Sequence, residues 1–281
     1  MPANRRRLLI TAATATLLAS VLPGCAQTPP KEEFKPVVGQ SGKDVIWVPT
    51  PDEVVQRMLD MVELRPGERV VDLGSGDGKI AIAAARRGAR ARGIEYNPDM
   101  VALSQRNARA AGVQVDFKQG DIFQSDFKDA DVVTLYLLPT LNERLRPILL
   151  EMKPGTRVTS HQFRMGDWEP DRTDALSGRD AHLLIVPAKV GGAWNVRIGN
   201  EPPLRLEMQQ QFQKLQGHAV AAGGNRTALA RTNLRGSTIQ FEVPAATGAM
   251  RFDGTVESGG RILGTVTSPT GQRRPFTATR S

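Results

Sequence analysis

The stretch that decides the fold is residues 69–79, which read RVVDLGSGDGK. The apolar run 69–73 is typical of a buried strand, and the glycine-rich residues 74–78 follow it directly. Residues 79–87 are rich in alanine and predict a helix. A strand, a glycine turn and a helix in this order form the first half of a doubly wound α/β unit.

Two acidic residues distinguish this turn from a loop that binds phosphate. The glycines follow the spacing G-x-G-x-G, and Asp72 stands two residues before Gly74. A carboxylate at this place repels phosphate and attracts a cation, and Asp77 adds a second carboxylate. The pattern favours a ligand with an ammonium and a sulfonium, so it predicts S-adenosylmethionine as the cofactor. The alternative is a tight turn whose aspartate only caps the helix.

Further elements of an open sheet follow along the chain. Thr50-Pro51-Asp52-Glu53 predicts a helix start with Thr50 as the cap and Glu53 completing a capping box. The remaining strands are expected at residues 91–94, 113–118, 131–138 and 157–163, and helices at 54–62, 97–108 and 144–152. Strands that alternate with helices predict a parallel sheet with right-handed crossovers.

Four polar residues follow or end these strands, where ligands of α/β sheets bind. Glu95 is placed to accept both ribose hydroxyls, and Asp121 lies where adenine contacts arise, with a simple turn aspartate as the alternative. Tyr136 is a candidate to orient an acceptor amine or to make a cation–π contact; otherwise it is a core residue. His161 is a candidate general base, with a structural histidine as the alternative.

Residues 46–170 resemble class I methyltransferases, most closely the group that includes the ATP synthase c-subunit lysine methyltransferases. The segments that carry the resemblance are VPTPDEVV (48–55), VVDLGSGDGK (70–79), GIEYNPDMVAL (93–103), QGDIF (119–123), VVTLYLLPTLNERLRPILL (132–150) and KPGTRVTSHQF (153–163). The resemblance implies N-methylation of a protein lysine, with a protein as the substrate. It implies cofactor contacts at Thr50, Asp72, Gly74, Gly76, Glu95 and Asp121. We expect Ser75, Asp77 and Gly78, which belong to the same glycine turn as Gly74 and Gly76, to contact the cofactor as well. Many amino-methylating enzymes have Asn/Asp-Pro-Pro-aromatic after the fourth strand, whereas this chain has Tyr136-Leu137-Leu138-Pro139.

The amino terminus predicts an export signal over residues 1–24. Arg5–Arg7 precede the uncharged stretch Leu8–Leu22, the order of a positive region and a short apolar region in such signals. Leu22-Pro23-Gly24-Cys25 resembles a bacterial lipobox, which implies lipidation of Cys25. Residues 25–44 then predict a flexible tether. We expect a lipid-anchored domain in the cell envelope that faces the periplasm. The alternative is an uncleaved anchor with the domain facing the cytoplasm.

The rest of the chain divides into a methyltransferase domain, residues 45–187, and a smaller antiparallel β domain, residues 188–281. The latter has short strand-like runs between glycine and proline turns. Its first strands are also candidates to complete the methyltransferase sheet. Aromatic residues are only 5% of the chain, and the net charge of +8 is not gathered in a run with aromatics. Nucleic acid is therefore not an expected partner. No metal-ligand cluster is visible, and nothing indicates an oligomeric state.

A second functional hypothesis follows from the export signal. S-adenosylmethionine is made in the cytoplasm and is permanently charged, so an exported enzyme would lack its methyl donor. The alternative function is therefore an exported, lipid-anchored binding protein that keeps the fold without catalysis. The complete set of Asp72, residues 74–78 and Glu95 favours the enzyme, because it preserves a whole ligand site.

Overall fold

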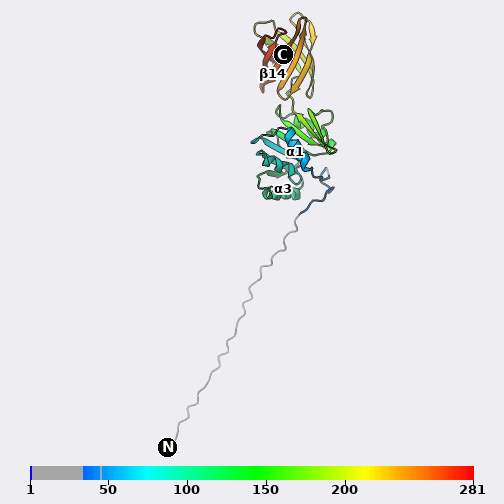
Figure 1. Cartoon of the computed structure of the whole chain (residues 1–281), viewed down its shortest axis with the longest axis vertical. Helices are drawn as coiled ribbons and strands as arrows, with labels where there is room; N and C mark the ends of the chain where they lie inside the picture. Colours follow the sequence, from blue (N-terminus) through cyan, green and yellow to red (C-terminus); the bar gives the residue numbers. More distant parts are fainter. Residues whose placement is uncertain (2–33, 45) are drawn as a thin grey trace. The chain divides into compact units, whose positions relative to one another are not determined.

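The protein contains an α/β part followed by an antiparallel β part, as the sequence predicts. The computed structural model describes Met1, residues 34–44 and residues 46–281. Residues 52–185 hold four helices and a seven-stranded sheet, and residues 192–280 form a nine-stranded sheet. In Figure 1, α1 and α3 mark the first part and β14 marks the second. The predicted signal and Cys25 lie outside the described residues.

The first sheet has the strand order β3-β2-β1-β4-β5-β7-β6. The first five of these pair in parallel, whereas β7 runs antiparallel to both β5 and β6. The carboxyl ends of the parallel strands therefore meet at one edge, with β1 between β2 and β4. The strands are β1 Arg69–Leu73, β2 Arg90–Glu95, β3 Asp116–Gln119, β4 Val132–Leu135, β5 Arg157–His161, β6 Arg172–Leu176 and β7 Arg179–Ile185.

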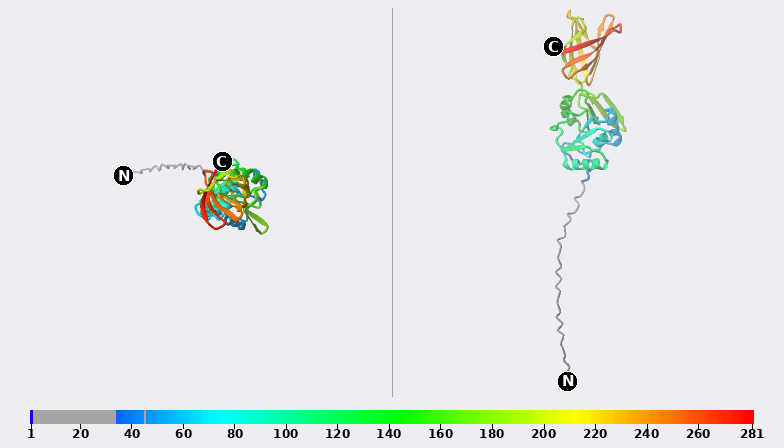
Figure 2. Two further views of the ribbon diagram at one scale, coloured as in Figure 1. Left: turned by 90° about the horizontal axis from the view of Figure 1, so that it is seen from above. Right: turned by 90° about the vertical axis from the view of Figure 1, so that its left-hand side faces the viewer.

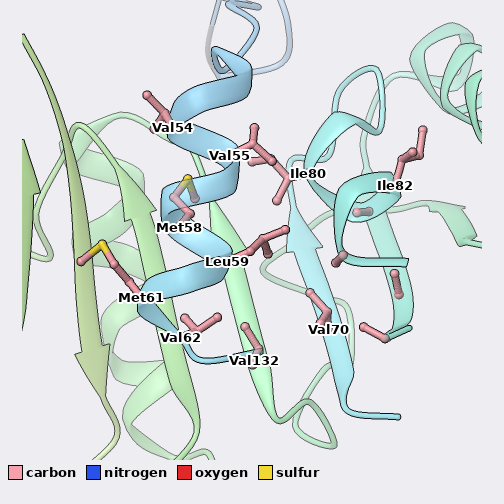
Figure 3. Close-up of a cluster of buried hydrophobic side chains, with 14 of the residues drawn as sticks. Val54, Val55, Met58, Leu59, Met61, Val62, Val70, Ile80, Ile82 and Val132 are labelled. Atoms are coloured by element: carbon pink, nitrogen blue, oxygen red, sulfur yellow. The ribbon is translucent and has the colours of Figure 1, made fainter. Parts of the chain in front are cut away.

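Alternate side chains of the strands face two separate apolar clusters. Val70 belongs to one cluster, together with buried residues of α1, α2 and α3, whereas Val71 belongs to the other, with residues of α4. Figure 3 shows the side chains of α1 over the strands that carry Val70 and Val132. Each fully buried aliphatic side chain contributes about 1.5–3 kcal/mol, so both faces stabilise the sheet. The helices are α1 Asp52–Met61, α2 Lys79–Arg86, α3 Pro98–Ala110 and α4 Pro139–Leu150.

Three local predictions need correction. Thr50 does not cap α1, because Pro51 occupies the cap position and no side chain bonds there. The expected fourth strand ends at Leu135, and its helix begins at Pro139 rather than residue 144. Proline suits the first helical turn because its missing N–H would have no partner there. The first strands after residue 188 do not complete the methyltransferase sheet, because the hairpin β6–β7 of residues 172–185 does so and β8 (Gly192–Ile198) belongs to the second sheet.

The second sheet is antiparallel and has the order β11-β10-β9-β8-β16-β15-β14-β13-β12. Three of its phenylalanines pack together: the rings of Phe241 and Phe252 stack with centroids 4.7 Å apart, and Phe276 meets Phe252 edge to face at 5.2 Å. Figure 2 shows the strands side by side in a curved sheet. The strands are β8 Gly192–Ile198, β9 Leu204–Gln211, β10 Lys214–Val220, β11 Arg226–Ala228, β12 Ala230–Arg235, β13 Thr238–Ala245, β14 Gly248–Val256, β15 Arg261–Thr267 and β16 Arg273–Arg280.

Within the described residues, no helix is both long and apolar enough to cross a bilayer. The same residues contain no group of three or more potential metal ligands.

Candidate functional site

A cavity of about 300 Å³ lies at the carboxyl edge of the first sheet. Residues from the tips of β1, β2 and β4, and the loop after β3, line it. The structure thus brings together nine of the residues that the sequence singles out: Thr50, Asp72, Gly74, Ser75, Gly76, Asp77, Glu95, Asp121 and Tyr136. Gly78 and His161 do not line the cavity.

The glycine turn serves both packing and access to the cavity. Gly74, Gly76 and Gly78 have φ values of 72°, 53° and 84°, which side chains other than glycine rarely adopt. A Cβ on Gly78 would lie 2.5 Å from Cζ of Phe117, so this glycine is needed for packing between α2 and β3. A Cβ on Gly76 would lie 2.9 Å from Nε1 of Trp47, so Gly76 is needed on the cavity side.

Glu95 is held in a fixed orientation by two backbone groups. Its Oε2 accepts a hydrogen bond from the N–H of Gly76 at 3.0 Å, and its Oε1 accepts one from the N–H of Asn97 at 2.9 Å. A carboxylate has about four acceptor sites, so each oxygen keeps capacity for a further donor. The side chain is therefore preorganised to accept two hydroxyl groups of a ligand.

Asp72 is a buried carboxyl at the floor of the cavity. Only 2% of it is exposed, and the Thr134 hydroxyl donates to its Oδ1 at 2.6 Å. Burial raises the pKa of Asp72 to about 7, against the opposing effect of the Thr134 bond, and the charges of Asp77 and Glu95 raise it further. Three carboxylates around one cavity destabilise one another, and a bound cation would relieve that repulsion.

Asp121 is paired with a lysine that precedes the α/β part. Lys43 Nζ lies 2.6 Å from Asp121 Oδ2 and 4.7 Å from the centre of the Tyr96 ring. The N–H of Phe123 donates to Oδ1 at 2.9 Å. The hydrogen bond from Lys43, followed by that from Phe123, lowers the pKa of Asp121. Asp121 is therefore ionised and fixed at the edge of the cavity.

His161 lies behind the cavity wall and does not face the cavity. Its Nδ1 is 3.2 Å from Oγ1 of Thr50, and its ring centroid is 3.9 Å from that of Tyr136. Burial, and to a smaller extent the charges of Arg179 and His182, lower its pKa to about 4. A neutral imidazole with this pKa is a weak proton acceptor, which argues against the predicted role of His161 as the general base. It supports Thr50 and Tyr136 instead.

Residues 37–44, which the composition places in a flexible tether, form with residues 46 and 47 a hydrogen-bonded turn beside the cavity. The N–H of Gly39 donates to the Trp47 carbonyl, and the N–H of Trp47 donates to the Gln40 carbonyl, both at 2.9 Å. Trp47 and Lys43 line the cavity. Sequence reasoning missed both, and the aromatic residue directly before the predicted helix start was the available signal. Phe163 and Met100 also line the cavity and were missed.

Comparison with known proteins identifies similar chains over this region. The profile of the ANTKMT methyltransferase domain matches residues 72–172. A protein-lysine N-methyltransferase of Saccharolobus islandicus (strain REY15A) is 41% identical over 151 residues, which cover 50% of this chain and 94% of the relative. The adenine nucleotide translocase lysine N-methyltransferase of Mus musculus is 33% identical over 180 residues, or 60% and 73% of the two chains.

One similar solved structure has a different stated activity. It is an RNA methyltransferase from Salinibacter ruber in complex with S-adenosyl-L-homocysteine, with a TM-score of 0.50 and 51% sequence identity. The match covers 51% of this chain and 96% of that one. The antiparallel β part lies beyond the span of residues that the family profile matches.

Proposed function

Because the chain belongs to the ANTKMT methyltransferase family, in which it matches protein-lysine N-methyltransferases over most of their length, we propose that it methylates the ε-amine of a protein lysine. S-adenosylmethionine is the methyl donor. The observation that carries the proposal is that Asp72, Glu95, the glycine turn and Tyr136 all line one cavity.

The residues of the cavity fit the cofactor. Asp72 is a buried carboxyl without a cationic partner among the groups that hold it, and a positively charged amino acid group would stabilise its ionised form. Glu95 presents acceptors for the ribose hydroxyls. Gly74, in the glycine turn, is exposed and lines the cavity, so its backbone is open to a ligand. When bound, the cofactor supplies a methyl group on a sulfonium, which is already activated for displacement.

The protein then has to align an amine and remove its charge. A lysine ammonium has no free electron pair, so it must lose its proton to solvent before it reacts. A poorly hydrated wall lowers the pKa of an amine, and Tyr136, Leu138 and Phe163 are among the apolar or aromatic residues that line the cavity. Alignment of two reactants contributes about 7–11 kcal/mol to such a reaction, so catalysis does not require a dedicated base.

Charge distribution favours protein over RNA as the acceptor. Residues 1–187 carry 25 basic and 24 acidic side chains, whereas residues 188–281 carry 12 and 5. The part with the cavity is thus nearly neutral, and binding to the phosphates of RNA needs a basic surface around the site. RNA methylation remains the second candidate because of the Salinibacter ruber relative.

A labelling experiment separates the two acceptors. The full chain is incubated with S-adenosylmethionine that carries a labelled methyl group, and with protein and RNA from the same cells in separate reactions. We expect label on protein, with a methyl mass increment on lysine in peptide mass spectra. Label confined to RNA would contradict the proposal, as would no label in either reaction.

The finer features of the architecture are part of the same proposal. The fold is of the doubly wound, Rossmann-like methyltransferase type, since helices cover both faces and strand order reverses at β1 and β4. We further propose residues 45–187 as the methyltransferase domain and residues 188–281 as the antiparallel β domain, with loss of residues 1–24. The predicted tether 25–44 is too long, because Gln40, Lys43 and Asp44 line the cavity.

The anchor and location are also proposed, from the lipobox-like Leu22–Cys25. We expect lipidation at Cys25 and a domain that faces the periplasm, with a domain facing the cytoplasm as the alternative. Cells grown with a labelled fatty acid should label the wild-type chain and not the Cys25→Ser variant. Equal labelling of both chains would contradict lipidation, and protection from added protease in spheroplasts would place the domain in the cytoplasm.

Replacing Trp47 with alanine is expected to weaken cofactor binding by roughly tenfold. Trp47 lies against Gly76 over the cavity, and its loss removes apolar area that covers the ligand, at about 25 cal/mol per Å². Calorimetry with S-adenosylhomocysteine measures the affinity, and Trp47→Phe is the matched control that keeps an aromatic ring. An unchanged affinity in Trp47→Ala would show that Trp47 does not contribute to cofactor binding.

A further inference from the structure

Phe163 and Tyr136 border the same end of the cavity. They follow β5 and β4 and both line the cavity. Their ring centroids lie 6.3 Å apart, with 21° between the planes. In the sheet, β4 and β5 lie on one side of β1. On the other side lie β2, which ends at Glu95, and β3, whose following loop contains Asp121. The two rings therefore stand away from the residues that fit the nucleoside.

The backbone before Phe163 is held in a strained corner. Gln162 has a φ of 66°, and a residue other than glycine in this region costs on the order of 1–3 kcal/mol. The surroundings compensate: the N–H of Gln162 donates to the Asp180 carbonyl at 2.7 Å, and that of Phe163 to the His161 carbonyl at 2.8 Å. Strain that is held in this way concentrates at functional sites.

Two fully buried side chains, Ser160 and Asn142, hold the backbone at Phe163 by hydrogen bonds. The Ser160 hydroxyl donates to the Phe163 carbonyl at 2.6 Å, and the Asn142 amide donates to the same carbonyl at 3.2 Å. Asn142 Nδ2 also lies 3.2 Å from the Arg164 carbonyl. Asn142 belongs to α4, which begins directly after the tip that carries Tyr136. A single buried amide thus links the two chain segments that present the rings.

We propose that this corner, residues 160–163, holds Phe163 as the second aromatic wall of the acceptor subsite. The inference rests on the proposed function. Phe163 packs against the alkyl chain of the incoming lysine, beside the contact made by Tyr136. An apolar wall favours the neutral amine because it disfavours the ammonium.

The decisive variant is Phe163→Ala in the full chain, compared with Phe163→Leu. The readouts are the KM and kcat for the acceptor protein identified by methyl labelling, and the affinity for S-adenosylhomocysteine by calorimetry. We expect Phe163→Ala to raise the KM for the acceptor about 10-fold or more while the S-adenosylhomocysteine affinity stays within about twofold. Phe163→Leu should recover most of the loss, since it restores an apolar wall. Thermal unfolding of each variant checks that the fold is retained.

Gln162 tests the corner itself. Glycine adopts a positive φ freely and valine does not, so Gln162→Val should raise the acceptor KM more than Gln162→Gly. An unchanged acceptor KM in Phe163→Ala would overturn the inference, and so would an equal loss of S-adenosylhomocysteine affinity. Failure of the proposed function is visible separately, because wild-type protein would then place no methyl group on lysine.

Discussion

Replacement of Asp72 by asparagine is expected to abolish binding of S-adenosylmethionine and, at the same time, to stabilise the unliganded protein at neutral pH. The carboxyl is buried, and its pKa is raised to about 7 from an ordinary 3.8. Asparagine keeps the shape of the side chain and an oxygen that can accept from the Thr134 hydroxyl. It removes the charge, which the cofactor needs and the empty fold does not, and it replaces one oxygen with an NH₂ group.

The sign of the stability effect follows from proton linkage. A carboxyl with a raised pKa binds its proton more tightly in the folded state, so folding is undisturbed below pH 4 and loses stability as the pH rises towards 7. At 1.36 kcal/mol per pKa unit, the rise in the pKa of Asp72 corresponds to a cost of about 4 kcal/mol above pH 7. Asp72→Asn removes this cost, but its amide NH₂ has no hydrogen-bond partner, which destabilises the variant by about 1–3 kcal/mol. The net stabilisation expected for Asp72→Asn is therefore roughly 1–3 kcal/mol at pH 8, and smaller at pH 5.

Urea unfolding at pH 5 and pH 8 measures this difference, and calorimetry measures the affinity. Glu53→Gln is the matched control, because it also exchanges a carboxylate for an amide but lies exposed on α1, away from the cavity. That variant should change neither quantity. An Asp72→Asn protein that is less stable than wild type at pH 8 would show that the Asp72 carboxylate stabilises the fold. One that still binds the cofactor would contradict the role of the Asp72 charge in binding.

The parts of the site that could be predicted from the sequence are those encoded within a few residues. Asp72 lies near the end of a strand, and Gly74 and Gly76 follow that strand directly. Such a strand and glycine turn place these residues at the carboxyl edge of the sheet. Glu95 lies at the tip of the next strand, and parallel strands bring their carboxyl ends to one edge. Local pattern and sheet topology together are therefore enough to place these residues around one cavity.

The residues that sequence reasoning missed depend on contacts between distant segments. Lys43 reaches Asp121 across 78 positions, and composition alone places Lys43 in a tether. His161 loses its basicity through burial behind Tyr136, and burial is a tertiary property. Thr50 bonds to His161 rather than to the helix it precedes, which no capping rule anticipates. Long-range packing overrides local preference in each of these cases.

Replacement of Glu95 is expected to remove the hydrogen bonds to the ribose of the cofactor, whereas replacement of Asp72 removes the attraction to its positive charge. Hydrogen bonds to a charged group contribute about 1.5–3 kcal/mol each, so two ribose hydroxyls account for roughly 3–6 kcal/mol. Glu95→Gln loses the charge, and its amide NH₂ faces a backbone N–H of either Gly76 or Asn97 that the carboxylate accepted. Affinity should fall at least 100-fold, since 1.4 kcal/mol is about a factor of ten.

Three ligands distinguish the two acids. Adenosine carries the ribose but neither the ammonium nor the sulfonium, and S-adenosylhomocysteine carries the ribose and the ammonium. Glu95→Gln should weaken all three ligands, including S-adenosylmethionine, by a similar factor, because each presents the same hydroxyls. Asp72→Asn should leave adenosine binding nearly unchanged while it weakens the two charged ligands. If both variants weakened adenosine equally, the cavity would not separate a cation end from a nucleoside end, and the placement of Phe163 on the acceptor side would lose its basis as well.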